Sequence, residues 1–111
     1  MTYKNVSDMI KAMGYPYAYY QFDENPENPP PPPFICFYYP SDNDFKADDT
    51  HYKKINELII ELYTDNKDFD VEAAVEAVLL SNGFVYGKSE NYIESEKMFQ
   101  IVYTMEVVLN A

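Results

Sequence analysis

Apolar side chains recur at helical spacing near the start of the chain. The four that share the i, i+3, i+4, i+7 spacing are Val6, Met9, Ile10 and Met13. Thr2 or Asn5 can cap the start of a helix here, and Gly14 is suited to end it because glycine tolerates positive φ. We therefore predict a short amphipathic helix over residues 5–14.

The next apolar segments have the pattern of strands. Residues 15–22, "YPYAYYQF", are aromatic and predicted to be extended, and residues 34–39, "FICFYY", are apolar on both faces. Residues 52–63 show the clearest alternation. Leu58, Ile60 and Leu62 fall on one face, which we assign to the core, while Glu57 and Glu61 point outward. At roughly 3.3 Å per residue this segment spans about 40 Å, long enough for part of it to project beyond the sheet.

The pattern turns helical again after residue 65 and then returns to strands. Five apolar residues form the helical stripe: Val71, Ala74, Val75, Val78 and Leu79. Asp68 or Asp70 can cap this helix, and Gly83 can end it. Residues 84–93 and 97–109 are then two strands joined by "ESE". In the second strand the core positions are Phe99, Ile101, Tyr103, Met105 and Val107.

The order helix, strand, strand, strand, helix, strand, strand predicts an α+β fold. We expect a mainly antiparallel sheet of four to five strands with the two helices packed on one face. Residues 1–111 form a single domain, with a Pro-rich loop at 23–33 and an acidic loop at 40–51. Because the sheet is aromatic on both sides, its second face needs cover, which a partner chain could supply.

Composition narrows the function classes. The net charge of −11 argues against a surface for nucleic acid or for an anionic membrane. The single cysteine excludes an intrachain disulfide framework. No apolar run approaches the roughly 20 residues of a membrane span, and "MTYKNVSDM" lacks a signal-peptide core. We expect a protein that is soluble inside the cell or part of something assembled there.

Few residues could carry chemistry. His51 lies near several aspartates, which suggests a metal site, but the EF-hand spacing is missing and a solvated acidic loop explains the cluster. Cys36 has no basic neighbour to lower its pKa and fits a packed core thiol. Glu57 and Glu61 could form a carboxylate pair, yet any strand places such residues on one face. A Gly-rich phosphate loop is absent. We expect no catalysis, no metal and no cofactor.

The five prolines at 29–33 have competing interpretations. Any such run contains the PxxP pattern of an SH3 ligand, but its acidic neighbours Glu24 and Glu27 are unlike the basic flank that such ligands carry. The run could instead be a spacer, or a stiff lead-in to the strand that begins at Phe34, because proline cannot donate to a sheet ladder.

Two long segments resemble the tail terminator, or tail completion, proteins of long-tailed bacteriophages and prophages. They are "PPFICFYYPSDNDFKADDTHYKKINELIIELYTDNKDFDVEAAVEAVL" and "YIESEKMFQIVYTMEVVL". The shared plan is an N-terminal helix, a Pro-led strand, an acidic loop, a long strand, a capped helix and a hairpin. It covers about nine-tenths of the chain. The family's usual single proline is here a run of five.

The resemblance implies a structural protein without catalysis or cofactor. Family members form a ring, typically a hexamer, that sits on the tube of major tail protein, ends its polymerisation and offers a surface to a head-completion or neck protein. Such a protein is located in the virion, at the head-proximal end of the tail, after assembly in the host cytoplasm. Six copies would carry 6 × −11 = −66 formal charges, so that genome DNA could pass through the channel without specific binding, and no membrane is involved.

The prolines and the acidic loop are the candidate assembly elements. We hypothesise that segments 28–33 and 41–50 lie on ring surfaces or at the channel and serve assembly, not folding. The candidate interface residues are Pro29, Pro30, Pro31, Pro32, Pro33, Asp42, Asp44, Phe45, Asp48, Asp49, Glu57 and Glu61.

Two other function classes fit part of the pattern. Small size and strong negative charge are also typical of an acidic DNA mimic that inhibits a nuclease or a restriction enzyme, although the acids at 23–27 and 42–49 are gathered in loops and not spaced like phosphates. A small adaptor that uses PxxP would need a polyproline-binding partner.

Overall fold

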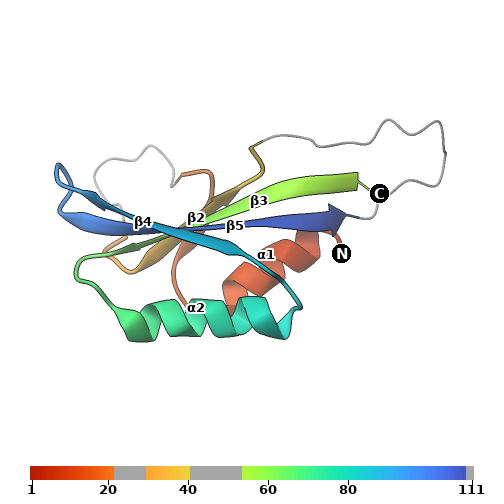
Figure 1. Ribbon diagram of the computed structural model, residues 1–111, viewed down its shortest axis with the longest axis horizontal. Helices are drawn as coiled ribbons and strands as arrows, with labels where there is room; N and C mark the ends of the chain where they lie inside the picture. The colour runs from red at the N-terminus through yellow and green to blue at the C-terminus, as the bar shows by residue number, and fades with distance from the viewer. Residues whose placement is uncertain (22–29, 41–53, 110–111) are drawn as a thin grey trace.

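The computed structural model describes residues 1–21, 30–40 and 54–109, and Figure 1 shows the arrangement of their elements. Within these residues the chain forms two helices and five strands. In chain order they are α1 (Tyr3–Ala12), β1 (Tyr17–Tyr19), β2 (Phe34–Tyr38), β3 (Lys54–Thr64), α2 (Phe69–Ser81), β4 (Gly87–Ile93) and β5 (Met98–Leu109). This order confirms the predicted α+β fold.

The strands form one mixed sheet in the order β1-β2-β3-β5-β4. β1 runs parallel to β2, and the other three pairings are antiparallel. At the centre, β3 and β5 pair from Lys54 opposite Leu109 to Thr64 opposite Phe99. Both helices lie on the same side of the sheet, as predicted (Figure 1). We call this side the covered face and the opposite side the open face.

Local sequence signals set the helix ends. The Thr2 hydroxyl accepts a hydrogen bond from the Asn5 N–H at 3.1 Å, and the Asn5 side chain accepts one from the Thr2 N–H at 2.9 Å, which makes a reciprocal capping box. Asp68 caps α2 by accepting from the Val71 N–H at 3.1 Å. Gly14 follows α1 with φ +90°, a conformation that strains any residue with a Cβ.

The core lies between the covered face and the two helices. It contains the whole predicted stripe of α1, together with Leu58, Ile60 and Leu62, all three of which are fully buried. The predicted core alternation of β5 is also confirmed from Ile101 to Val107, while Phe99 is half-buried against the core. Strand alternation alone was therefore sufficient to select the correct face of β3 and β5.

Two predictions of detail were wrong. Ala74 is exposed, and the inner side of α2 carries Glu72 beside Val75 and Leu79. The strand expected from residue 84 begins only at Gly87. The segment before it turns away from β5, which leaves part of β5 without a neighbour on that side among the described residues.

Candidate assembly surfaces

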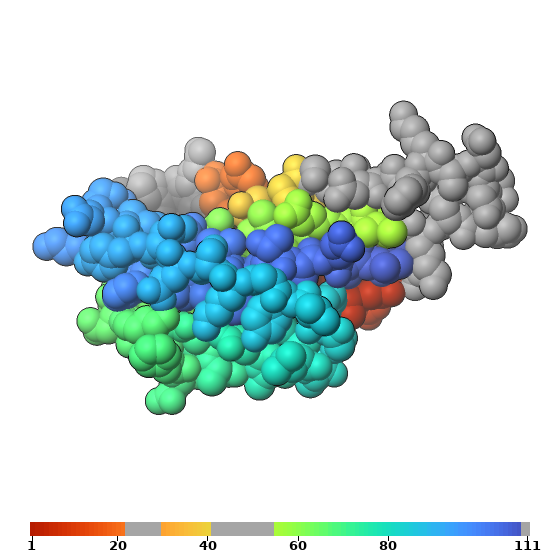
Figure 2. All heavy atoms as spheres, in the orientation of Figure 1, coloured from red at the N-terminus to blue at the C-terminus, as the bar shows by residue number. Residues whose placement is uncertain are grey.

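An ion cluster joins α2 to β4 on the covered face. The Lys67 ammonium contacts Glu72 at 2.7 Å and also pairs with Glu90, while the Lys88 ammonium contacts Glu72 at 2.8 Å and Glu76 at 2.7 Å. Only 2% of the Glu72 side chain is exposed, so this carboxylate depends on its two lysine partners. Figure 2 shows α2 lying against β4 along the lower front of the molecule.

The lysines control the ionisation of this cluster. Burial alone would raise the pKa of Glu72, but the hydrogen bonds and charges of Lys67 and Lys88 outweigh burial and hold that pKa below its ordinary value of 4.5. The pKa of Glu76 is lowered in the same way, because Lys88 and the Tyr103 hydroxyl, which donates to Glu76 at 2.8 Å, outweigh the opposing effect of burial. Both carboxylates are therefore charged at neutral pH.

The open face has a different composition. No described helix packs on it. The residues that point to it include Phe34, Cys36 and Tyr38 from β2, Glu57, Ile59, Glu61 and Tyr63 from β3, and Gln100, Val102, Thr104, Glu106 and Val108 from β5. Three glutamates project from this face, and none of its described strand residues is a lysine. The open face is thus acidic, with aromatic side chains at one end.

Hydrogen bonds link the polar groups of the open face across four strands, β2, β3, β5 and β4. Glu61 accepts from the Tyr63 hydroxyl at 2.8 Å and from the Tyr38 hydroxyl at 3.3 Å. The Gln100 amide donates to the Tyr63 oxygen at 3.0 Å, and the Asn91 amide reaches Gln100 at 3.3 Å. Glu61 is therefore an acceptor within a side-chain network of the open face.

Cys36 lies under the aromatic end of the open face. It is 6% exposed, and burial together with the Glu61 charge raises the pKa of its thiol to about 11. A thiol with this pKa stays protonated at neutral pH and is a poor nucleophile. The geometry agrees with the packed thiol expected from the sequence.

The other candidate residues from the sequence divide into described and undescribed positions. Asp42, Asp44, Phe45, Asp48, Asp49, His51 and Pro29 lie outside the described residues. Pro31 is exposed, while Pro32 and Pro33 are half-buried and border a small hollow beside the turn from β3 to α2. Glu57 lies on the open face at the mouth of a larger groove.

That larger groove follows an unpaired edge of β5. β4 starts at Gly87 opposite Thr104, so residues 105–109 of β5 have no strand on their outer side among the described residues (Figure 1). The groove between this edge and residues 82–85 has a volume of about 800 Å³, and Glu57, Glu106 and Val108 line it from the sheet. Val85 is 90% exposed beside it. We call this surface the β5 groove.

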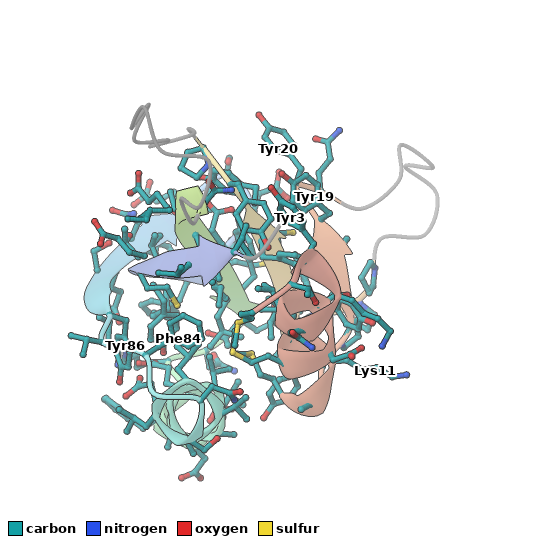
Figure 3. The ribbon with its side chains drawn as sticks, turned by 90° about the vertical axis from the view of Figure 1, so that its right-hand side faces the viewer. Tyr3, Lys11, Tyr19, Tyr20, Phe84 and Tyr86 are labelled. Atoms are coloured by element: carbon teal, nitrogen blue, oxygen red, sulfur yellow. The ribbon has the colours of Figure 1, made fainter. Side chains whose placement is uncertain are left out.

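A second groove lies at the opposite edge of the sheet. It has a volume of about 340 Å³, it is almost wholly apolar, and it is lined by Tyr3, Ser7, Tyr19, Phe37 and Tyr39. Tyr19 packs edge-on against Phe37 with ring centroids 5.4 Å apart, and Tyr3 packs edge-on against Tyr39 at 5.3 Å. We call this surface the β1 groove. Figure 3 shows Tyr3 and Tyr19 on the side of the molecule opposite to Phe84 and Tyr86.

Sequence reasoning found neither groove nor the ion cluster. The available signal for the cluster was a pair of glutamates four residues apart, Glu72 and Glu76, on a helix whose neighbouring strand carries Lys88. Nowhere in residues 1–21, 30–40 and 54–109 do three or more His, Cys, Asp or Glu side chains gather as a metal site would require. No helix in these ranges is long and apolar enough to span a membrane.

No family model matches the chain, and no curated protein does. Chains of solved structures do match. One of them belongs to a structure described as the virion of a native gene transfer agent (GTA) particle; the match has a TM-score of 0.60 at 14% sequence identity and covers 93% of this chain and 84% of that one. At this identity the match shows a shared fold over nearly the whole length of both chains.

Proposed function

We propose that this chain is a structural protein of a phage-like particle, and that it forms a ring at the head-proximal end of the tail tube. The ring ends polymerisation of the tube protein and provides the surface that joins the tail to the head. The observation that carries the proposal is the shared fold with a chain of a virion particle over 93% of this chain. The order of its segments, which resembles that of tail terminator proteins, supports the finer assignment.

The charge of the open face fits a surface that lies next to DNA without binding the DNA. Glu57, Glu61 and Glu106 project from this face without a lysine among its described strand residues. A surface with this charge repels phosphates, and repetition around a ring strengthens the repulsion. In this proposal genome DNA passes the ring without being held.

The proposal assigns no catalytic role to the chain. The described thiol is buried with a pKa raised to about 11, and the described carboxylates of the covered face are paired with lysines. These groups stabilise the fold, which accords with a protein whose activity is assembly.

Electron microscopy of tails tests the proposal. We expect the purified protein, mixed with tail tubes of the particle that encodes it, to appear as a ring at one end of each tube. Deletion of its gene should give tails longer than normal and filled heads that remain unjoined. Tails of normal length joined to heads in the deletion strain would overturn the proposal. Inhibition of a nuclease by the purified monomer would favour the acidic DNA mimic instead.

A further inference from the structure

The sheet ends in two unpaired edges that lie on opposite sides of the molecule. One is the outer edge of β1, beyond which no described strand pairs; the other is β5 from Met105 to Leu109. At the two ends of β1, the Ile35 N–H donates to the Pro16 carbonyl and the Tyr20 N–H donates to the Phe37 carbonyl. Because bonding alternates along a parallel pair, the N–H groups of Tyr17 and Tyr19 point away from β2. The Tyr19 carbonyl already accepts from the Gln21 N–H at 2.8 Å, so these two N–H groups are the donors that the β1 edge offers to another strand.

The two edges are compatible in direction and in face. β1 is parallel to β2, β2 is antiparallel to β3, and β3 is antiparallel to β5, so β1 and β5 run the same way. If β1 of a second copy lies parallel to β5 of the first, the helices of both copies fall on the same side of one continued sheet. The copies of a closed ring are related by rotation, so the same face of every copy points inward. A sheet that continues between copies must therefore keep the helices of all copies on one side.

The side chains next to the edges are complementary in shape and polarity. Val85 stands 90% exposed beside the β5 edge, so its apolar side chain is left largely uncovered by the described residues. The β1 groove offers an apolar hollow of about 340 Å³ at the other edge, between Ser7 of α1 and Phe37 of β2. Val85 of the first copy can therefore be buried in the β1 groove of a second copy, whose β1 strand pairs with β5 of the first copy.

The charges near the edges select the same pairing. Glu57 and Glu106 line the β5 groove, and the described residues include no cation paired with either. Two β5 edges brought together would oppose four glutamates, whereas the β1 edge, Tyr17–Tyr19, and the β1 groove bring no carboxylate against them.

We infer that the β5 groove binds the β1 edge of a second copy of this chain, head to tail, with Val85 of one copy seated in the β1 groove of the next. The contact rests on the ring proposed above and names the surfaces that close it. β1 lies level with residues 101–103 of β5, whereas the free edge is centred on Val107. To keep both open faces on one side of the continued sheet, Ala18 of β1 must lie opposite an open-face residue of the free edge, Glu106 or Val108. Neighbouring copies are therefore displaced along the strands by four or six residues, or roughly 13 or 20 Å, which inclines the strands to the ring axis.

Cysteine cross-linking tests the contact. One chain carries Val85→Cys and another Ser7→Cys; the wild-type chain controls for Cys36, which is buried. With a short bis-maleimide, the mixture of the two variants should give a covalent dimer, whereas neither variant should give one alone. A chain that carries both substitutions should give a ladder that stops at the number of copies in the ring. Phe69→Cys, 72% exposed at the far end of α2, replaces Val85→Cys in the control mixture and should give no dimer.

A charge variant provides an independent readout. Because Val85 is so exposed, Val85→Glu should leave the melting temperature unchanged and weaken self-association about tenfold or more, as measured by sedimentation.

The possible outcomes separate this contact from the proposed function. Dimers of Val85→Cys alone would indicate a two-fold contact and overturn the inference, as would a protein that stays monomeric at all concentrations and on tail tubes. Rings that cap tubes without the expected cross-link would overturn the contact and leave the proposed function standing. A head-to-tail ladder from a protein that does not bind tail tubes would support the contact and overturn the proposed function.

Discussion

The two faces of the sheet treat their carboxylates in opposite ways. On the covered face, Glu72 and Glu76 are held by Lys67 and Lys88. On the open face, no described strand residue offers a lysine to the glutamates. The Lys–Glu ion pairs fix α2 against β4. Glutamates without a cationic partner repel one another and do not favour folding, so their value to the protein lies in the charge that they give to the surface. The ion pairs of the covered face thus stabilise the fold, whereas in our proposals the open face lies beside DNA and the sheet edges join neighbouring copies.

The largest expected effect tests burial on the two faces through adjacent isoleucines. Ile60 is fully buried under the helices, and Ile59 is half-buried on the open face. Ile60→Ala should lower the free energy of unfolding by about 2–5 kcal/mol, because it leaves a cavity in the core. Ile59→Ala should lower it by about 1 kcal/mol, because less area is lost. Urea unfolding of the monomer measures both, and equal losses would mean that the open face is covered in solution.

Next in size is the loss of a buried carboxylate. Glu72→Gln should destabilise the protein by about 2 kcal/mol, because two lysines lose their charged partner. This figure already allows for the partial exposure of both lysines, since water stabilises part of their charge. The matched change on the open face, Glu57→Gln, should alter stability by less than about 0.5 kcal/mol. If the two variants unfolded at the same urea concentration, the contrast between the faces would be wrong.

A smaller effect is expected from single hydroxyl groups. Tyr103 is fully buried and donates to Glu76, so Tyr103→Phe should cost about 1 kcal/mol. Tyr38 donates to Glu61 over 3.3 Å at a half-exposed site, and Tyr38→Phe should cost less than about 0.5 kcal/mol because water can replace the bond. Thermal unfolding of the two variants gives the comparison, and a larger loss for Tyr38→Phe would reverse it.

The smallest expected effect is on the pH dependence of stability. The pKa values of Glu72 and Glu76 are lowered in the folded state, so their stabilisation is present above pH 4.5 and is lost as pH falls through the lowered values. The wild-type protein should therefore lose stability below pH 4.5 more steeply than Glu76→Gln, with little difference between them in slope at pH 6–8. Urea midpoints recorded across this range measure the slope. Parallel curves for the two proteins would mean that the partners of Glu76 do not lower its pKa in the folded state.

The sequence predicted most of the fold because periodicity reports directly on burial. The stripe of α1 and the alternation of β3 and β5 both place apolar residues where the core is. It failed at Ala74 and Glu72, because a helix that packs near the edge of a sheet can turn polar residues inward when the strand supplies lysines. Such partners are distant in sequence and carry no periodic signal.

The candidate surfaces were harder to predict than the fold. The acidic and proline segments attracted attention by composition, but the β5 groove depends on where β4 begins to pair, at Gly87 and not at Phe84. Residues 84–86 have the apolar character of a strand, so their departure from the sheet could not be read from their side chains. The edge of a sheet is decided by chain geometry, and single-residue preferences describe it poorly.

The three-residue strand β1 has a consequence for the order in which the chain folds. The β4–β5 hairpin closes locally, with Ile93 opposite Met98, whereas β3 must find β5 across separations of 35 residues (99 − 64) to 55 residues (109 − 54). β1 forms only three residue pairs, all parallel, with β2, and β2 in turn is held in the sheet by its pairing with β3. Long loops close slowly and short parallel pairings gain little, so β1 should be the last strand to join. Hydrogen exchange should find its amides the least protected of the sheet. A copy that has not finished folding then has no β1 edge to offer, and the contact between copies would admit only complete molecules.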